Sequence, residues 1–358
     1  MTEISKGLII LDGYFSVDYV YVRNFLDTVG EVSSLSEFAT LSNNFFRKRI
    51  KDFSVKNYEA YFTEKAYLSL IDNYAKSGVS VITEFSSNYP RELKEISFRP
   101  ICLYLKGNAS LLQRKNKFSI VGSRKTLPSV LKTTEDFSKQ LSSSGVVIVT
   151  GVAGGGDLSA IKGAIGSGNL ICVSASGFDY VYKEYTREYI DKIIEKGLLI
   201  SEKPPKVKAM PYFYPVRNRI IAGLGKGLLV ISGSNKSGTR HTYNYALEYG
   251  KDVFSFPYGL GVTSGEICNE IIKEGGYLVT SIEDITSALN FELKKSEEVR
   301  LSDREKQVLS VIKNGNFSVD EIILATGYKV FEVLPTLTCL EIKGLIVKNG
   351  GEYQAVKN

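Results

Sequence analysis

Short apolar runs alternate regularly with longer amphipathic stretches in the middle of the chain. Six runs rich in Val, Ile, Leu and Phe are each followed by a glycine- or serine-rich turn and then by a helical pattern; they cover residues 118–121, 146–149, 170–173, 198–200, 228–231 and 253–256. Near-continuous apolarity is typical of strands that are buried on both faces of a sheet. Strands that alternate with helices form right-handed βαβ units. The pattern therefore predicts a doubly wound, mostly parallel α/β sheet.

The first 80 residues show helical periodicity instead. Residues 17–26 form one candidate amphipathic element and residues 58–76 form another. The expected buried stripe of the second is aromatic and aliphatic and comprises Tyr61, Tyr67, Leu68, Leu70, Ile71 and Tyr74. Apolar residues at this spacing lie on one face of a helix. We therefore expect a small helical N-terminal domain whose aromatic residues lie mostly in a core.

The segment after residue 300 has the pattern of a winged helix. Ser302 and Ser318 are each followed three residues later by a glutamate, which is the spacing of a helix capping box. A third helix is predicted over residues 331–343, and a hairpin wing over residues 345–353. The predicted organisation is thus a helical domain at residues 1–80, a Rossmann-like sheet domain at 81–290, a charged linker at 291–300 and a winged helix at 301–358.

Positive charge is concentrated in one part of the chain. Residues 201–240 hold eight lysines and arginines against one acid, Glu202, whereas the formal net charge of the whole chain is +6. Tyr212, Phe213 and Tyr214 stand in the middle of this stretch. Cations beside aromatic rings suit a flexible polyanion whose bases can stack, such as single-stranded nucleic acid. A solvated charged loop is the alternative interpretation.

The turns that follow the predicted strands carry groups that attract anions. Because ligands of an open parallel sheet bind outside the carboxyl ends of its strands, these turns should meet at one edge. The candidate residues are Gly122, Ser123 and Arg124 after the first strand, Lys183 after the third, Phe213, Arg217, Asn218 and Arg219 after the fourth, and Lys236, Ser237, Gly238 and Thr239 after the fifth. The second turn, residues 151–157, has four glycines, which suit either ligand contact or tight packing against a helix.

Other classes of function find little support. Neither G-x-x-x-x-G-K-[ST] nor G-x-G-x-x-G is present at the strand ends, so the usual mononucleotide and dinucleotide sites are not indicated. The chain has a single histidine, His241, and four widely spaced cysteines, which we expect to be reduced core thiols. We predict no catalytic residue, no metal site and no cofactor. Without a long apolar run or a signal peptide, we also expect a cytoplasmic protein with no membrane partner.

From about residue 79 to residue 281 the chain resembles the DNA-processing protein A (DprA/Smf) family. The most specific match is the segment Arg217-Asn218-Arg219-Ile220-Ile221-Ala222-Gly223-Leu224. Further matching segments occur in the family's order and include Tyr89-Pro90, Lys106-Gly107-Asn108, Ile120-Val121-Gly122-Ser123-Arg124, Gly177 with Asp179, Phe213 with Pro215, Ser237-Gly238-Thr239 and Pro257. The tail fits the winged-helix domain that many members carry.

The resemblance implies a protein that binds single-stranded DNA and loads a RecA-type recombinase onto it during natural transformation, in competent cells. It also implies a homodimer formed through the central domain, no covalent chemistry, and a DNA pocket at the candidate residues given above. The tail carries seven basic and seven acidic residues, so we expect it to contact protein and not duplex DNA.

Some positions depart from the family pattern. Gly154 replaces a basic residue, Ile161 a histidine, and Tyr258 a glycine. These changes leave open whether the chain serves transformation or a divergent role. The alternative function is a small-nucleotide sensor, or an enzyme like the nucleotide phosphoribohydrolases, for which residues 237–239 with Glu248 are a faint match that lacks the P-G-G motif.

Overall fold

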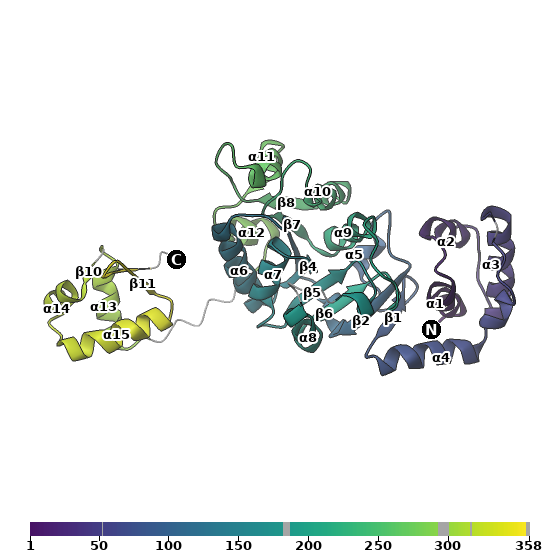
Figure 1. Ribbon diagram of the computed structural model, residues 1–358, viewed down its shortest axis with the longest axis horizontal. Coiled ribbons are helices and arrows are strands. Elements are labelled where there is room, and N and C mark those ends of the chain that lie inside the picture. Colours follow the sequence, from purple (N-terminus) through teal and green to yellow (C-terminus); the bar gives the residue numbers. More distant parts are fainter. Residues whose placement is uncertain (52, 182–186, 293–300, 316, 356–358) are drawn as a thin grey trace. The chain divides into compact units, whose positions relative to one another are not determined.

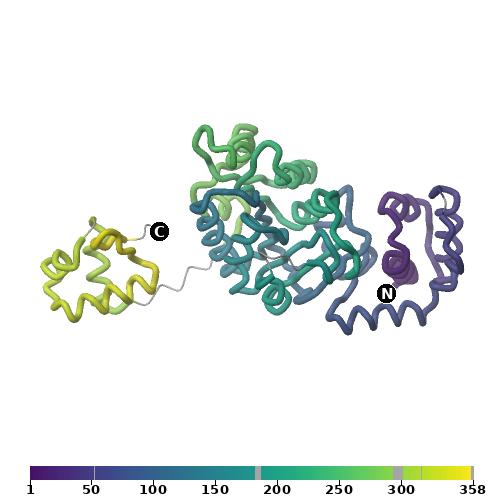
Figure 2. Tube along the Cα trace, viewed as in Figure 1, coloured from purple at the N-terminus to yellow at the C-terminus, as the bar shows by residue number. Residues whose placement is uncertain are grey.

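The computed structural model describes residues 1–51, 53–181, 187–292, 301–315 and 317–355, and it divides into two compact units, Met1–Leu293 and Lys294–Asn358 (Figures 1 and 2). The first unit contains the N-terminal helices and the large sheet. The second contains the winged helix. We describe each unit by itself.

A nine-stranded sheet forms the centre of the first unit. Its strand order is β1-β2-β6-β5-β4-β3-β7-β8-β9, and all neighbours from β6 to β9 are parallel. The strands are β1 (Ser80–Thr83), β2 (Cys102–Gly107), β3 (Lys117–Val121), β4 (Val147–Gly151), β5 (Leu170–Ser174), β6 (Leu198–Ser201), β7 (Gly227–Val230), β8 (Asp252–Ser255) and β9 (Tyr277–Leu278). The predicted α/β, doubly wound sheet is confirmed. The antiparallel strands β1 and β2 extend it beyond β6.

Helices cover both faces of this sheet (Figure 1). One face packs against α6 (Pro128–Ser143), α7 (Gly156–Ala164), α8 (Arg187–Lys196) and α12 (Ile282–Leu289). The other packs against α5 (Arg91–Lys94), α9 (Phe213–Leu224), α10 (Thr239–Glu248) and α11 (Glu266–Lys273). Successive strand residues point to opposite faces. In β4, Ile148 therefore joins one core, whereas Val147 and Val149 join the other.

The N-terminal helices share the core on the α6 face of the sheet. They are α1 (Glu3–Phe15), α2 (Tyr19–Leu26), α3 (Leu35–Arg49) and α4 (Glu64–Lys76). In α4 the expected residues Tyr67 and Leu70 are buried, whereas Leu68 lies on the exposed side of the helix. Tyr61 is also exposed and precedes α4, which begins at Glu64. Since these helices belong to the same compact unit as the sheet, a separate domain over residues 1–80 stays a prediction.

The second unit is a winged helix, as predicted. It consists of α13 (Asp303–Ile312), β10 (Phe317–Ser318), α14 (Val319–Thr326), α15 (Val330–Ile342), β11 (Ile346–Asn349) and β12 (Glu352–Ala355). Both predicted capping boxes are present, with Ser302 and Ser318 as the capping residues. Among the described residues no single helix is long and apolar enough to cross a membrane; α14 and α15, bent by 112°, meet that length and composition only as a pair.

Candidate nucleic-acid interface

The sheet has a topological switch point between β3 and β7. From β3 the chain proceeds through β4, β5 and β6 in one direction, and from β7 through β8 and β9 in the other. In sheets of this kind the crevice at the carboxyl ends of the two central strands is the preferred ligand position. Here the backbone N–H of Ser123 donates to the carbonyl oxygen of Ser232 at 3.1 Å and to its hydroxyl at 3.0 Å. The turns after β3 and β7 are therefore joined directly.

Tyr258 lies across the same crevice. Its hydroxyl donates to the carbonyl of Ile231 at 2.7 Å and lies 3.2 Å from the hydroxyl of Thr126. Its backbone N–H and carbonyl are both bonded to the Asn269 side chain, at 3.0 Å each. With the hydroxyl and the backbone of Tyr258 both held, the switch point is bridged by protein, which disfavours a small nucleotide there.

The glycines after β3 and β4 pack against each other. A Cβ on Gly156 would lie 2.6 Å from the Cα of Gly122, and a Cβ on Gly122 would collide with the side chain of Ile231. Gly155 has a φ of 73°, and a side chain there would meet the backbone of Ser123 and Arg124. Of the two interpretations of this glycine-rich turn, the geometry favours tight packing of backbone on backbone.

Arg217 lies beneath these turns, not on the surface. Its side chain is buried and Nη1 donates to the carbonyl of Val173 at the end of β5. Next to it, burial raises the pKa of Asp157 to about 6, although the Arg217 guanidinium and the Gly122 N–H act in the opposite direction. Burial also lowers the pKa of Arg217. The buried Arg217 thus stabilises the carboxyl ends of the strands from the interior of the unit.

Asn218 connects Arg217 to the turn after β7. Its Oδ1 accepts a hydrogen bond from Nε of Arg217 at 3.0 Å, and its Nδ2 donates to the carbonyl of Gly238 at 3.5 Å. The loops after β4, β5 and β7 are therefore held in one arrangement by two neighbouring residues of α9. The structure brings both predicted residues to the edge, in a supporting position.

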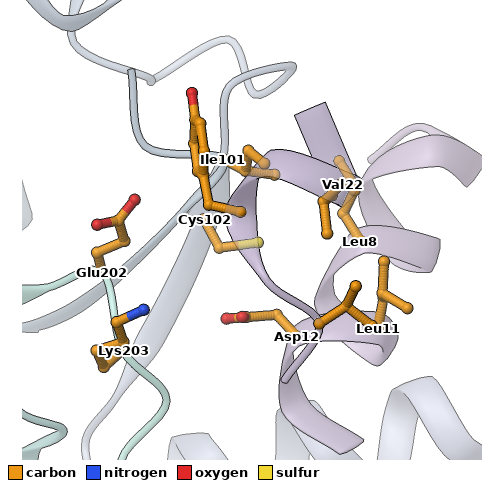
Figure 3. A pocket seen from close by; sticks show the side chains of 10 residues that line it. Leu8, Leu11, Asp12, Val22, Ile101, Cys102, Glu202 and Lys203 are labelled. Carbon is orange, nitrogen blue, oxygen red and sulfur yellow. The ribbon is translucent and has the colours of Figure 1, made fainter. Parts of the chain in front are cut away.

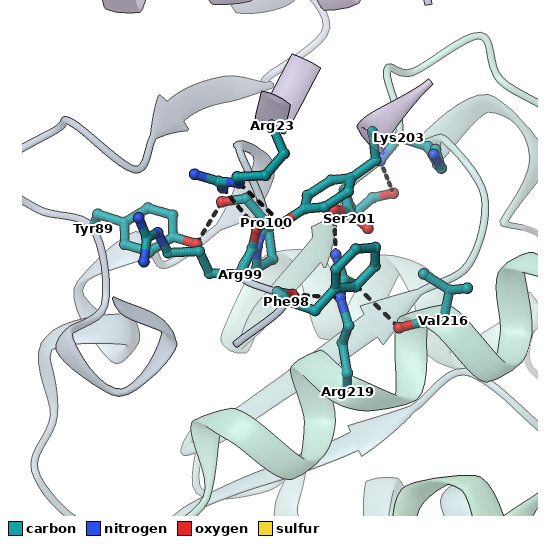
Figure 4. A network of polar contacts seen from close by, with 11 residues as sticks. Arg23, Tyr89, Phe98, Arg99, Pro100, Ser201, Lys203, Val216 and Arg219 are labelled. Carbon is teal, nitrogen blue, oxygen red and sulfur yellow. Dashed lines mark hydrogen bonds and ion pairs between the residues drawn. The ribbon is translucent and has the colours of Figure 1, made fainter. Parts of the chain in front are cut away.

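Arg219 is placed away from the edge. Its side chain is wholly buried, and it donates to the carbonyls of Phe98 (2.6 Å) and Val216 (3.0 Å) and to the carboxylate of Glu202 (2.5 Å) (Figure 4). Its guanidinium also lies 4.6 Å from the centroid of the Phe98 ring. Because these partners occupy its donors, the expectation of a phosphate contact by Arg219 needs correction: here it is an internal structural residue.

The exposed part of the edge is smaller than the charge count implies. Arg240 is paired with Glu270 at 2.5 Å, and Lys226 lies at the amino end of the sheet, where its N–H donates to the carbonyl of Lys117. Arg124 and Lys236 are exposed, and neither forms an ion pair within the described parts of the chain. Together with Lys125, which is also exposed in the turn after β3, these side chains are cations that the described structure leaves available beside the switch point.

The turn after β7 leads into α10 with an open backbone. Gly238 caps the helix, is exposed, and has no heavy atom within 4 Å of where a Cβ would stand. The hydroxyls of Ser237 and Thr239 lie 2.9 Å apart, and the N–H of Thr239 donates to the Ser237 hydroxyl at 3.3 Å. The N–H groups of Thr239, Arg240 and His241 already donate within this turn, to Ser237 and Gly238, so the open space over Gly238 is what remains accessible to an anion. Ser237 and Gly238 therefore offer a phosphate an approach that Gly122 does not.

An exposed ring stands at the start of α9. Tyr212 is 62% exposed and packs edge-on against Phe213, with their ring centroids 4.6 Å apart. Phe213 itself is half-buried, and Nζ of Lys203 lies 4.6 Å from its ring centroid. The sequence favoured Phe213 as the stacking residue, but Tyr212 presents more ring to solvent, and Lys203 was not among the candidates. Lys183 lies outside the described residues.

Behind this edge is a small cavity of about 50 Å³ between α1 and the strands (Figure 3). Asp12 of α1 points toward it and accepts a hydrogen bond from the Tyr104 hydroxyl at 2.7 Å. Burial raises the pKa of Asp12 to about 6, and the Lys203 ammonium acts in the opposite direction. The described residues contain no cluster of His, Cys, Asp and Glu that suits a metal ion.

The fold and this edge define a Rossmann-like protein with an appended winged helix. More particularly, the chain belongs to the DNA recombination-mediator protein A family, whose model matches residues 80–290; the DprA winged helix domain matches residues 293–352. It is 34% identical to the DNA processing protein DprA of Bacillus subtilis, over 68% of this chain and 82% of the relative. The Streptococcus pneumoniae DprA is also 34% identical, over 68% and 86%.

Two solved structures agree with this assignment. DNA processing protein A from Streptococcus pneumoniae superposes with a TM-score of 0.64 at 28% identity, covering 82% of this chain and all of that one. DNA processing protein A from Helicobacter pylori, whose structure describes a single-stranded DNA binding mode, gives a TM-score of 0.55 at 25% identity, covering 60% of this chain and 97% of that one.

Proposed function

We propose that this chain binds single-stranded DNA with little sequence preference at the carboxyl edge of its sheet. The observation that carries the proposal is the grouping, at one end of the sheet, of unpaired exposed cations, an open helix start and an exposed ring. Each suits a different part of an unpaired strand, namely its phosphates and its bases. The single-stranded DNA binding mode of the Helicobacter pylori relative supports it.

We assign the proposed DNA contacts to the candidate residues whose side chains or backbone are exposed to solvent. Phosphates lie against Arg124, Lys236 and the turn formed by Ser237 and Gly238, with Lys183 kept as a prediction. Tyr212 and Phe213 offer rings to bases. Gly122, Ser123, Arg217 and Asn218, together with Thr239, hold the loops in place, and Arg219 is not part of the contact surface.

A gel-shift series tests the proposal. Single-stranded, duplex and RNA oligomers are compared at two salt concentrations. If about four phosphates are neutralised, log K against log salt has a slope of roughly −3 on single strands. Equal affinity for duplex, or an affinity that does not change with salt, contradicts the proposal.

The same proposal includes what the chain does once bound. It loads a RecA-type recombinase onto the strand, acts as a homodimer formed through the sheet unit, and works in the cytoplasm without a cofactor or a covalent step. The test is recombinase filament formation on single strands covered by a single-strand-binding protein, with and without this chain. No acceleration at saturating protein contradicts the mediator role while leaving DNA binding intact.

The small-nucleotide alternative has a specific observation against it. Tyr258 bridges the switch point through its bonds to Ile231 and Thr126, where such a ligand would otherwise lie. Calorimetric titration with nucleoside monophosphates separates the two functions, because the proposal expects no saturable heat from a monomeric nucleotide and measurable heat from oligo-dT.

A further inference from the structure

Exposed cations gather at the end of α3, in the N-terminal part of the sheet unit. The last turn of this helix holds three basic residues, and two lysines follow before the short helix η1 (Tyr58–Tyr61). All five side chains are exposed, and within the described residues none of them forms an ion pair or a side-chain hydrogen bond. This cationic cluster comprises Arg47, Lys48, Arg49, Lys51 and Lys56.

Few acidic side chains accompany the cationic cluster. Between residues 38 and 58 the sequence has a single acid, Asp52, which lies outside the described residues. Glu59 accepts a hydrogen bond from Nδ2 of Asn43 at 3.1 Å, and Glu37, in the first turn of α3, accepts one from the N–H of Ser33 at 2.8 Å. Residues 47–56 therefore carry a formal charge of +4, from five cations and one acid, whereas the whole chain carries +6.

Aromatic core residues hold the segment of the cluster in place. Phe46 is buried, and the ring of Phe53 packs between Phe46 and Tyr58, with centroid distances of 5.5 and 5.7 Å. The guanidinium of Arg49 lies 3.9 Å from the centroid of the Phe45 ring. Stacking on a ring orients an arginine side chain and leaves its N–H groups available to an anion. The cations are thus exposed on a segment whose rings are anchored in the core.

A role in helix stability accounts for only part of the cluster. Cations in the last turn of a helix interact favourably with the helix dipole, but the effect falls off within that turn. Lys51 and Lys56 lie beyond Ile50, the C-cap residue of α3. Within residues 45–58 every aromatic ring is buried or half-buried, so this surface presents charge without rings. Such a surface suits the phosphates of a nucleic acid and not its bases.

Helix α2 connects the cluster to the proposed DNA-binding edge. At its start, the ring of Tyr19 lies 5.9 Å from the guanidinium of Arg219 in α9. Near its end, the ring of Phe25 packs against that of Phe45 in α3, with centroids 5.5 Å apart. Since α2 has eight residues, it is about 12 Å long. One short helix thus links α3 to α9, and a strand that extends past the edge can reach the cluster.

We propose that the cationic cluster is a second nucleic-acid site, which binds the phosphate backbone of DNA that extends beyond the sheet edge. The proposal rests on the proposed function, because the edge selects a single strand and the cluster adds affinity for a longer one. Without exposed rings, the cluster does not distinguish a single strand from a duplex. It therefore also accounts for the weaker affinity that we expect for duplex DNA.

Oligo-dT of two lengths separates the cluster from the edge. One variant combines Arg47→Gln, Lys48→Gln, Lys51→Gln and Lys56→Gln, and it retains Arg49 because that side chain packs on Phe45. We expect affinity for an oligomer of about 40 nucleotides to fall roughly tenfold, whereas affinity for one of about 8 nucleotides, which occupies only the edge, is unchanged. On the long oligomer, the loss of four phosphate contacts makes the slope of log K against log salt shallower by about 3. Fluorescence anisotropy measures both quantities.

The matched control removes the same charge elsewhere on the sheet unit. It combines Lys139→Gln, Lys162→Gln, Lys192→Gln and Lys196→Gln, which are exposed lysines of α6, α7 and α8. We expect the control to bind both oligomers as the native chain does, and circular dichroism of both variants to be unchanged. Duplex affinity should fall in the cluster variant alone.

Three outcomes contradict the inference in different ways. Equal losses in the two variants mean that only the overall charge matters. Unchanged binding of the long oligomer by the cluster variant, with slower recombinase loading, means that the cluster contacts an acidic protein surface and not DNA. A native chain that does not bind the short oligomer overturns the proposed function itself, and the inference with it.

Discussion

The guanidinium of Arg219 and the carboxylate of Glu202 form an ion pair of 2.5 Å in the interior of the sheet unit. Arg219 belongs to α9, which follows the exposed Tyr212. Its guanidinium lies 4.6 Å from the ring centroid of Phe98 (Figure 4) and 5.9 Å from that of Tyr19 in α2. Next to it, Arg23 of α2 pairs with the buried Glu84, which also binds Arg99. The two sets of charge pairs meet at Tyr19, whose ring lies beside Arg219 and whose hydroxyl accepts a hydrogen bond from Nε of Arg23, so they connect α9 to the N-terminal part of the unit.

Glu202→Gln should destabilise the sheet unit. The substitution leaves the Arg219 charge buried without a counter-charge, and breaking a buried pair in this way costs about 3–5 kcal/mol. Urea unfolding followed by circular dichroism measures the loss. Glu195→Gln, which removes an exposed acid of α8, is the control and should leave stability unchanged. A Glu202 variant of normal stability that binds oligo-dT more tightly would return Arg219 to the DNA contact surface, because the guanidinium would then be free for a phosphate.

Gly122→Ala should lower the stability of the protein, whereas Gly238→Ala should lower its affinity for DNA. A Cβ on Gly122 collides with Ile231 and lies 3.2 Å from the Cα of Gly156, so we expect an overpacking cost of about 1–3 kcal/mol in stability. A Cβ on Gly238 meets nothing within 4 Å, so stability should hold, but the methyl group stands where a phosphate approaches the backbone. Affinity for oligo-dT should then fall several-fold. Thermal unfolding and fluorescence anisotropy on both variants show whether the effects separate in this way.

Tyr212→Ala should weaken binding of single strands by about 1–3 kcal/mol, which is roughly 5- to 150-fold in Kd, because it removes a ring on which a base stacks. Tyr212→Phe keeps the ring and should bind normally. The exposed Tyr14 of α1, replaced by alanine, controls for the loss of a surface aromatic residue elsewhere. Normal affinity of the Tyr212→Ala variant, together with a loss in Phe213→Ala, would restore the assignment that the sequence favoured.

Much of the architecture could be predicted because local sequence patterns determine it. The strands buried on both faces show as continuous apolar runs, and the capped helices of the tail as serine and glutamate three residues apart. The parallel arrangement then places all the turns at one edge without further information. The antiparallel strand β2 was missed as a sheet member, because its pairing with β6 depends on contacts far apart in sequence.

The candidate site was harder to predict because a sequence shows which residues are charged but not whether they are buried. Arg217 and Arg219 are two residues apart in a basic segment, yet one supports strand ends and the other pairs with Glu202 in the interior of the unit. Whether an arginine is exposed or paired internally depends on residues such as Glu202 and Phe98, which only the folded chain brings close. Tyr258 was visible as a replaced glycine, but its position across the switch point was not.

Arg124→Ala should reduce the salt dependence of binding. Removing one phosphate contact makes the slope of log K against log salt shallower by about 1, equally on all sequences. Lys226→Ala removes the same charge at the amino end of the sheet and serves as the matched control, with an unchanged slope. The measurement is fluorescence anisotropy with oligo-dT at four salt concentrations. An identical change in both variants would mean that only the overall charge matters, without a contact at Arg124.

Asp12→Asn should flatten the pH dependence of stability. Burial raises the pKa of Asp12 to about 6, above its ordinary value of 3.8. Between pH 4 and pH 6 the Asp12 carboxyl is therefore protonated in the folded state and ionised in the unfolded chain. The contribution of this group to the unfolding free energy is therefore highest below about pH 4 and falls as the pH rises to about 6, by about 3 kcal/mol. Asparagine still accepts the Tyr104 hydrogen bond but does not titrate. Urea unfolding at pH 4, 5, 6 and 7 should show a smaller fall for the variant, and equal falls in both proteins would mean that Asp12 is ionised throughout.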